Sequence, residues 1–243
     1  SSAASDVYKR QLKDGVVDSS PLSDTPRPGN AKFKKLTAID PNSTNPYQLT
    51  EADRTVIGNT TPKFSGGFGL NATYKGFDMS MFFNFMYDFD VLNANKIMLT
   101  TWADNKENNF LMNIASDKRW RNFDDMGNEI RYSPEVLAEF NKNATMWNPT
   151  SIGRPICMSY AVEDGSFLRL NSATLGYTLP SVWTKKVGLS KVRFYVSGNN
   201  LFTLTGYSGY DPEVNIATGL TPNIDYNRYP RSRTYTFGAQ LTF

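Results

Sequence analysis

Few residues of this 243-residue chain could do acid–base, nucleophilic or metal chemistry. It contains no histidine, which excludes Ser-His-Asp and Cys-His catalysis and histidine zinc sites. Cys157 is the single cysteine, so neither an intrachain disulfide nor a multi-cysteine metal cluster can form. Paired carboxylates stand at Asp124-Asp125 and at Asp211-Pro212-Glu213, but nothing places two of them across a cleft, as glycoside hydrolysis requires. The sequence therefore predicts no enzyme, no metal site and no cofactor.

Aromatic and basic residues suggest binding rather than catalysis. One long polar segment contains three tryptophans, Trp102, Trp120 and Trp147. They could contact a ligand or partner by stacking on sugar rings, although packing within a loop is the favoured alternative. A second group combines arginine with tyrosine: Arg228, Arg231 and Arg233 with Tyr226 and Tyr229. A formal net charge of +3 is too small to favour nucleic acid, so we expect a solvated rim near anionic lipid headgroups.

The elements that carry these residues are indicated first by the last ten residues, 234–243, which alternate without exception. Small or polar residues alternate with an apolar set: Tyr235, Phe237, Ala239, Leu241 and Phe243. Since successive side chains of a strand point to opposite faces, this strand has one apolar face. At a tilt near 45° it spans about 24 Å, close to the apolar band of an outer-membrane barrel. The apolar face either contacts lipid or packs on a second sheet.

Four more strands are predicted by the same alternation, at residues 63–74, 77–87, 166–179 and 191–203. The first two are joined by a tight turn at Lys75-Gly76. In the third, Arg169 and Asn171 share the parity of the apolar residues, so we expect a bulge near Asn171. Mean hydropathy is −0.46 and no apolar run approaches the length of a transmembrane helix, as expected for alternating strands.

The rest of the chain divides around these strands. Residues 1–30 are expected to be disordered, and 1–11 resemble translated sequencing-adapter sequence, so they are expected to contribute nothing to the fold. Residues 31–62 read as a loop that enters the strand region 63–243. Long connections at 88–163 and 206–233 alternate with short ones, as extracellular loops and periplasmic turns do. Two helices are predicted in the first long connection, at 91–102 and, after Ser133-Pro134-Glu135, at 135–142.

Short motifs along the chain resemble the C-terminal part of the SusC/RagA family. They occur in the family's order from about Ala31 to Phe243, and the clearest are these: Asp53-Arg54-Thr55-Val56-Ile57-Gly58-Asn59, Val162-Glu163-Asp164-Gly165-Ser166-Phe167-Leu168-Arg169-Leu170, Gly198-Asn199-Asn200-Leu201-Phe202 and Gly209-Tyr210-Asp211-Pro212-Glu213. Where many members carry an acidic run before Asp53-Arg54, this chain has residues 40–45 with one aspartate, which places any ion site there in doubt.

The resemblance implies an all-β fold, namely the C-terminal antiparallel strands of a 22-stranded transmembrane β-barrel with long extracellular loops that carry short helices. It implies a TonB-dependent importer of oligosaccharides or peptides in the bacterial outer membrane. The partners would be a SusD-like surface lipoprotein, the TonB complex through an N-terminal region upstream of this chain, membrane lipid and the barrel-assembly machinery.

Two expectations follow for this chain itself. Five strands cannot close a barrel, so we expect a fragment whose final strand carries the assembly signal in Tyr235, Phe237, Leu241 and Phe243. The alternative is a secreted carbohydrate-binding β-sandwich, in which a second sheet would cover the apolar faces.

Overall fold

The structure is a computed structural model. It describes residues 51–100, 111, 118–149, 157–214, 223–226 and 228–243, and short pieces before residue 51 at 2–3, 8–9, 12–13, 16–17, 28–33, 36–38 and 42. The chain forms two compact units. The sheet unit comprises Asn59–Val91 and Glu163–Phe243, and the loop unit comprises Ser1–Gly58 and Leu92–Val162.

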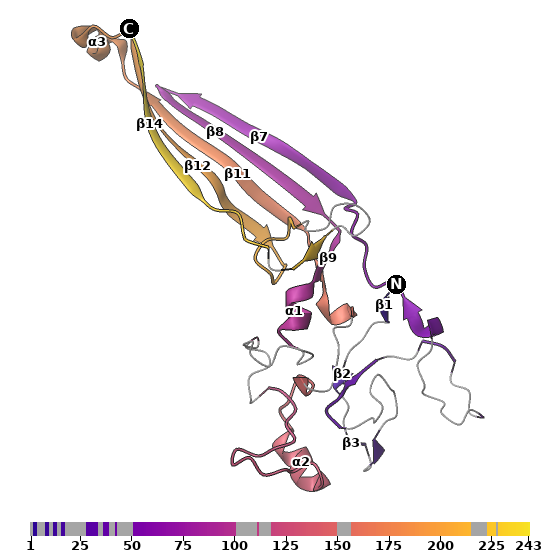
Figure 1. Ribbon diagram of the computed structural model, residues 1–243. Helices are drawn as coiled ribbons and strands as arrows, with labels where there is room; N and C mark the ends of the chain where they lie inside the picture. The colour runs from indigo at the N-terminus through magenta and orange to yellow at the C-terminus, as the bar shows by residue number, and fades with distance from the viewer. Residues whose placement is uncertain are drawn as a thin grey trace. The chain divides into compact units, whose positions relative to one another are not determined.

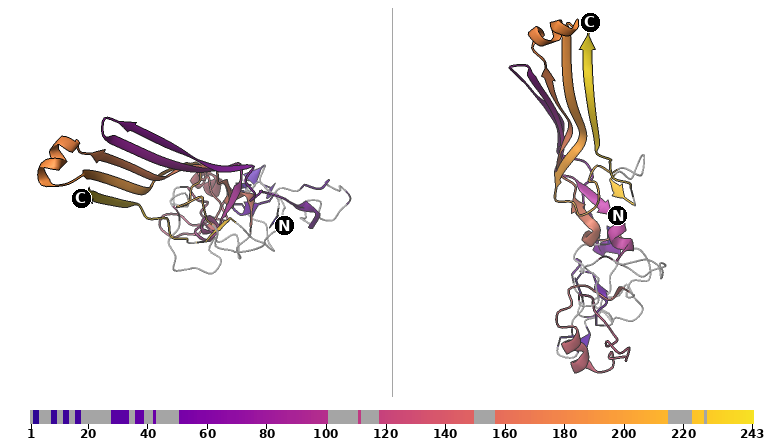
Figure 2. Two further views of the ribbon diagram at one scale, coloured as in Figure 1. Left: turned by 90° about the horizontal axis from the view of Figure 1, so that it is seen from above. Right: turned by 90° about the vertical axis from the view of Figure 1, so that its left-hand side faces the viewer.

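The sheet unit is built on five long antiparallel strands in the order β14-β12-β11-β8-β7. The strands are β7 (Phe64–Tyr74), β8 (Phe77–Tyr87), β11 (Phe167–Thr178), β12 (Lys191–Thr205) and β14 (Thr234–Thr242). They lie side by side in one curved layer (Figure 2). The predicted antiparallel all-β fold is confirmed, and strands stand where the alternating segments are.

Short connections and the last strand's end gather at one end of this sheet (Figure 1). The turn between β7 and β8 lies there, as do α3 (Ser181–Thr184) and the 3₁₀ turn η5 (Lys185–Val187) that join β11 to β12. Gly188 ends that link in the left-handed region at φ 75°. The long connections 88–163 and 206–233 begin at the other end, so short and long connections alternate along the sheet.

The β7–β8 turn depends on glycine at position 76. Lys75 and Gly76 both have positive φ, 46° and 89°, as a two-residue type I′ hairpin turn requires. A Cβ on Gly76 would also lie 2.8 Å from the carbonyl oxygen of Thr178, whose N–H donates to the Gly76 carbonyl. We expect Gly76→Val to destabilise the folded sheet by about 1–3 kcal/mol.

The measurement for Gly76→Val is the unfolding free energy of the full-length protein that contains this chain, refolded in lipid vesicles and titrated with urea. Lys75→Gly is the matched control, because it relieves a non-glycine residue with φ 46° in the same turn. We expect that control to be neutral or stabilising. Equal losses from both substitutions would contradict the assigned turn.

Strand register separates the side chains of the sheet into two chemically different faces. Residues directly opposite one another in paired strands share a face, so the pairing defines each face across all five strands. One row, for example, is Ala72, Met79, Leu175, Val196 and Phe237. We call the side of this row the apolar face. Its other members are Phe64, Phe68, Leu70, Tyr74, Phe77, Met81, Phe83, Phe85, Tyr87, Leu168, Leu170, Ala173, Tyr177, Val192, Phe194, Phe202, Leu204, Tyr235, Ala239 and Leu241, with Gly66 and Gly198.

The opposite side, the polar face, carries the charged and hydroxyl residues of the same strands. Its central row is Asn71, Ser80, Thr174, Ser197 and Thr236. Phe82 is an exception on this face: its ring lies over Gly67, where a Cβ would come within 2.8 Å of it. The register thus assembles one wholly apolar surface and one largely polar surface from strands far apart in the sequence.

The predicted bulge is confirmed, and it keeps the two faces in phase. Pairing of β11 with both neighbours shifts register between Leu170 and Ser172, so that Asn171 is the irregular residue. Because of this shift, Leu168 and Leu170 join the apolar face while Arg169 lies opposite Asn84 on the polar face. Without the bulge, the alternation of β11 would place Arg169 among apolar residues.

A small hydrophobic cluster lies at the end of the sheet unit where the long connections begin. It contains Phe89, Val91, Phe167, Tyr207 and Val214, with Met86 packed against it. The three short strands β9 (Asp90–Asn93), β10 (Val162–Asp164) and β13 (Ile224–Asp225) pair in the order β10-β9-β13. Both long connections therefore return to defined positions near the strand ends.

The loop unit has its own core, formed by Trp120, Ile130, Leu137 and Ala144 with Phe140. Its helical pieces are α1 (Ala94–Met98), α2 (Pro134–Phe140) and the 3₁₀ turns η1 (Glu51–Asp53) and η4 (Ser159–Ala161). The two predicted helices are thus present but shorter. β9 occupies the residues before α1, where the Asn93 side chain accepts a hydrogen bond from the Lys96 N–H at 3.0 Å. At α2, Pro134 begins the helix and Ser133 makes no side-chain capping bond.

The remaining strands of the loop unit are short. They are β1 (Ser2–Ala3), β2 (Tyr8–Lys9), β3 (Leu12–Lys13), β4 (Val16–Val17), β5 (Ala31–Lys32) and β6 (Arg54–Thr55), paired as β1-β6, β2-β5 and β3-β4. Most of the segment 1–30 that was expected to be disordered lies outside the described residues. Within the described part of the chain, no helix is long and apolar enough to cross a membrane.

Candidate functional site

The apolar face is the most distinctive surface of the sheet unit, because large side chains on it stand exposed. Phe237 is 80% exposed, Tyr74 69%, Tyr235 61% and Leu70 51%. The rings of Phe77 and Tyr177 lie 4.5 Å apart near the short-connection end. Contiguous apolar surface of this extent marks an interface with lipid or protein. The face carries no charged residue in any of its paired rows.

An ion pair crosses the polar face near the same end. The Arg193 Nε donates to Asp78 Oδ1 at 2.9 Å, and Arg193 Nη2 donates to Asp78 Oδ2. Arg193 is on β12 and Asp78 is on β8, so the pair spans the strand between them. Gly176 of β11 makes this possible, since a Cβ there would lie 2.4 Å from Arg193 Nη2. This ion pair therefore keeps both of its charges on the side away from the apolar surface.

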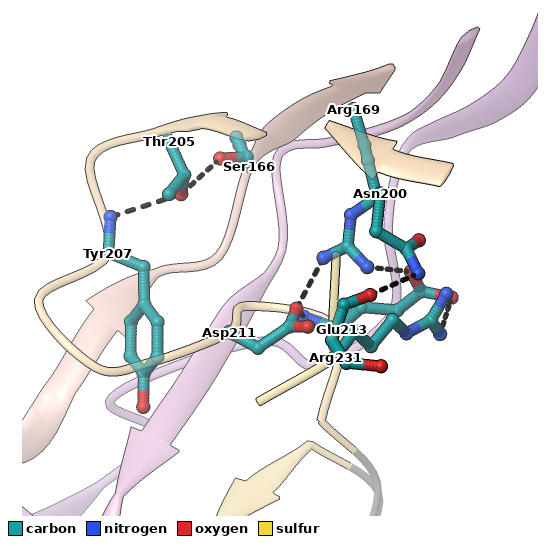
Figure 3. Close-up of polar contacts among 9 residues, drawn as sticks. Ser166, Arg169, Asn200, Thr205, Tyr207, Asp211, Glu213 and Arg231 are labelled. Atoms are coloured by element: carbon teal, nitrogen blue, oxygen red, sulfur yellow. Dashed lines mark hydrogen bonds and ion pairs between the residues drawn. The ribbon is translucent and has the colours of Figure 1, made fainter. Parts of the chain in front are cut away.

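A buried arginine holds the second long connection at the other end of the sheet (Figure 3). Arg169 is 2% exposed and donates from Nη2 to the Asp211 carboxylate. Its Nη1 lies 3.4 Å from Glu213 Oε2, and Arg231 Nη2 lies 2.8 Å from Glu213 Oε1. We call Arg169, Asp211, Glu213 and Arg231 the Arg169 cluster. Two arginines and two carboxylates thus balance in charge and fix residues 211–213 and 231 to β11.

Further hydrogen bonds shape the same connection. The Asn200 amide donates to the Ser232 carbonyl at 3.1 Å, and the Thr205 hydroxyl donates to the Ser166 carbonyl at 2.9 Å (Figure 3). Ser208 donates from its N–H and its hydroxyl to the Glu163 carboxylate, at 2.9 and 2.8 Å. The connection is therefore attached to the sheet unit at both of its ends.

Tyr207 makes the stability of this connection depend on pH in the alkaline range. Its hydroxyl donates to Asp225 Oδ2 at 2.7 Å, and burial together with this bond raises the pKa of Tyr207 well above its ordinary value of 10.0. A side chain whose pKa is higher in the folded than in the unfolded protein contributes its full stabilisation at pH values below its unfolded-state pKa. For Tyr207 this stabilisation is lost progressively as the pH rises above about 10. We expect unfolding titrations of the full-length protein to show an alkaline loss of stability that is smaller in Tyr207→Phe. An identical alkaline slope in the variant would contradict this assignment.

Two of the three tryptophans predicted as possible ligand contacts, Trp120 and Trp147, lie in the interior of the loop unit. Trp120 is 4% exposed and Trp147 is 2% exposed, and the Trp147 ring meets Tyr160 edge-on at 4.9 Å. Trp102 lies outside the described residues. This burial favours the packing alternative for Trp120 and Trp147, because neither ring presents an open face for stacking on a ligand.

The other residues singled out from the sequence are dispersed. Tyr235, Phe237 and Leu241 lie on the apolar face of β14, and Phe243 follows it at 87% exposed. Arg231 belongs to the Arg169 cluster, whereas Tyr229 is 88% exposed. Asp124 and Asp211 belong to different units. Partial burial raises the pKa of the Cys157 thiol, so little thiolate is present at neutral pH. Among the described residues no group of three acidic or cysteine side chains could hold a metal ion.

The Arg169 cluster is the part of the site that sequence reasoning missed. In the sequence, Asp211-Pro212-Glu213 is only a carboxylate pair that nothing places across a cleft, and Arg231 belongs to an expected solvated rim. One signal was available: Arg169 stands in a predicted membrane-length strand, where an unpaired arginine is expensive. Its partners are 42 and 44 residues away in the sequence, and local patterns do not predict pairing at that separation.

Comparison with known proteins shows which proteins this chain is similar to. No protein-family model matches the chain. It is 35% identical over 202 residues to TonB-dependent receptor P3 of Formosa agariphila, covering 81% of this chain and 18% of that protein. It is 38% identical over 88 residues to TonB-dependent receptor SusC of Bacteroides thetaiotaomicron, covering 35% of this chain and 8% of SusC.

A solved structure shows the same fold. The RagAB peptide importer in its closed-closed state matches 88% of this chain and 21% of the compared chain, with a TM-score of 0.60 and 24% identity. The chain spans about a fifth or less of the length of the proteins it matches. Their names are those of receptors and an importer, not of enzymes. The chain is therefore homologous to a segment of TonB-dependent receptors, SusC among them, and its open sheet has the barrel fold found in RagAB.

Proposed function

We propose that this chain forms part of the membrane-spanning wall of an outer-membrane importer. The observation that carries the proposal is the uncharged apolar face, exposed across five strands. β7 and β8 each have 11 residues, which span about 36 Å, or about 25 Å at a tilt near 45°. An outer-membrane barrel has an outward apolar band of about 25 Å, so these strands have the required length.

The orientation follows from the connections. Outer-membrane barrels have short periplasmic turns and longer extracellular loops. The β7–β8 turn and the α3–η5 link would then be periplasmic, and the connections 88–163 and 206–233 would be extracellular. The Arg169 cluster would lie at the extracellular end, on the side of the wall that faces the barrel interior.

Transport and partners belong to the whole protein. Its relatives are TonB-dependent receptors and, by fold, a peptide importer, which supports TonB-dependent import of oligosaccharides or peptides. A SusD-like surface lipoprotein would act with the extracellular loops, and the TonB complex would contact a region outside this chain. The barrel-assembly machinery would read the apolar residues Tyr235, Phe237, Leu241 and Phe243 around the edge strand β14.

Fractionation of cells that produce the full-length protein tests this proposal. We expect it in the outer-membrane fraction, with gel mobility that differs between boiled and unboiled samples. Recovery in a detergent-free soluble fraction would instead support the carbohydrate-binding sandwich, in which a second sheet covers the apolar face. Loss of outer-membrane signal in Phe237→Asp, but not in Thr236→Asp, would support β14 as the assembly signal.

A further inference from the structure

A pocket in the loop unit is lined by arginine and aromatic side chains that the membrane-spanning strands do not require. It holds about 310 Å³ and is lined by residues 119–124, Arg131, Asn148 and Pro149. This volume is at the lower end of the range for ligand pockets. The pocket therefore has room for one residue of a longer ligand rather than for a large cofactor.

Three arginines line the pocket, and one of them is firmly positioned. The Arg121 N–H donates to Asn141 Oδ1 at 2.7 Å, and the Asn141 amide donates back to the Arg121 carbonyl at 2.9 Å. Asn141 is only 3% exposed, so this backbone is fixed from inside the unit. The Arg121 guanidinium lies 4.4 Å from the centre of the Phe140 ring and pairs with Asp125 at 2.7 Å.

Each carboxylate near these arginines is either bonded within its own turn or paired with one arginine. Asp124 lines the pocket, but its Oδ1 accepts from the N–H groups of Met126 and Asn128 at 2.9 and 2.8 Å. The Asn128 side-chain and backbone hydrogen bonds lower the pKa of Asp124 and occupy its oxygens with its own turn. Glu129 pairs with Arg131 Nε from outside the lining. Arg119 has no ion-pair partner among the described residues, which leaves its guanidinium available.

An aromatic wall accompanies this charge. The buried Trp120 ring packs so closely on Gly29 that a Cβ there would lie 2.1 Å from Trp120 Cδ1. The Trp120 indole N–H has no acceptor among the described residues. Phe123 is 48% exposed beside it. The cavity thus combines the exposed Phe123 ring with guanidinium donors, the fork-shaped groups that bind carboxylates through two hydrogen bonds.

We propose that this pocket binds a carboxylate-bearing residue of an oligomeric ligand. Arg119 and Arg131 would hold the carboxylate, with Arg121 as the fixed third charge. The inference rests on the proposed import function, in which the connection 88–163, which carries the pocket residues, is extracellular. The carboxylate could belong to an acidic sugar or to an acidic amino acid, and the probes below separate these two sources.

The test is calorimetric titration of the purified full-length protein in detergent with tetragalacturonate, tetraglutamate and neutral maltotetraose. We expect one acidic probe to bind more tightly than the neutral one, and its Kd to rise at higher salt. Arg119→Gln and Arg131→Gln should each raise that Kd by about tenfold or more, since a hydrogen bond between charged groups is lost. Lys118→Gln is the matched control: it removes one charge from an exposed neighbour outside the lining and should leave the Kd unchanged.

Each outcome bears on the proposal. If neither acidic probe binds better than maltotetraose, or if Lys118→Gln weakens binding as much as Arg131→Gln, the pocket assignment is overturned. Outer-membrane fractionation and heat-dependent gel mobility of the same variants report on the wall separately. A protein that forms a barrel but shows no pocket-dependent binding would overturn this inference and leave the proposed function standing.

Discussion

Met79→Arg in the full-length protein is expected to lower the unfolding free energy of the barrel in lipid vesicles by about 2–4 kcal/mol. Met79 lies on the central row of the apolar face, between Ala72 of β7 and Leu175 of β11. An arginine placed there must leave water for hydrocarbon, or distort the bilayer to keep its charge hydrated. Urea titration of the refolded protein, followed by tryptophan fluorescence and gel mobility, measures the loss.

Ser80→Arg is the control for this substitution. Ser80 is the next residue of the same strand, but it lies on the polar face opposite Asn71 and Thr174. We expect that variant to stay close to the wild-type unfolding free energy. If Ser80→Arg were as costly as Met79→Arg, or if neither were costly, the assignment of the two faces would be wrong.

Arg169→Met is expected to cost about 3–5 kcal/mol of stability, because it leaves the Asp211 carboxylate buried without its cation. The Asp211 side chain is 10% exposed and the Arg169 side chain 2% exposed. The connection 206–233 should then detach from β11 and be cleaved faster by a protease added outside. Urea unfolding measures the first effect, and limited proteolysis of intact cells measures the second.

Arg231→Met is the matched control in the Arg169 cluster. Its side chain is 41% exposed, and ion pairs at that exposure contribute about 0–1 kcal/mol. The double variant Arg169→Met with Asp211→Leu should recover part of the loss, since it removes the unpaired charge. Equal costs for Arg169→Met and Arg231→Met would show that the Arg169 cluster does not fix the connection.

The wall could be predicted from sequence because its physics is local. Alternation of polar and apolar residues has the period of a strand, and it is visible in 64–74, 77–87 and 234–242 without knowledge of the rest of the chain. The bulge at Asn171 could also be predicted, because Arg169 broke the parity of an otherwise apolar set. Such a violation has few structural remedies in a long strand.

The loops could not be predicted to the same depth, because their contacts join residues far apart in sequence. Trp120 is buried in a core with Ile130, Leu137 and Ala144, and the sequence favours packing of this tryptophan without showing which residues it packs against. Arg169 meets Asp211 and Glu213 across a whole strand and loop. The arginine pocket likewise depends on Asn141, which holds Arg121 from 20 residues away.

The predicted start of the first helix was wrong for a further physical reason. The apolar periodicity of residues 91–102 suits a helix, but residues 90–93 pair as the strand β9 and leave Ala94–Met98 for α1. Tertiary pairing outweighed local propensity there.

Accessibility of spin labels at neighbouring positions tests the membrane wall most directly. Single cysteines replacing Leu175 and Thr174 in the full-length protein, with Cys157→Ser, would carry nitroxide labels in refolded vesicles. We predict that the label at 175 collides readily with dissolved oxygen and rarely with a water-soluble nickel chelate, and that the label at 174 shows a lower ratio of oxygen to nickel collisions. Equal ratios at the two positions, or nickel access at 175, would contradict a lipid-facing apolar surface.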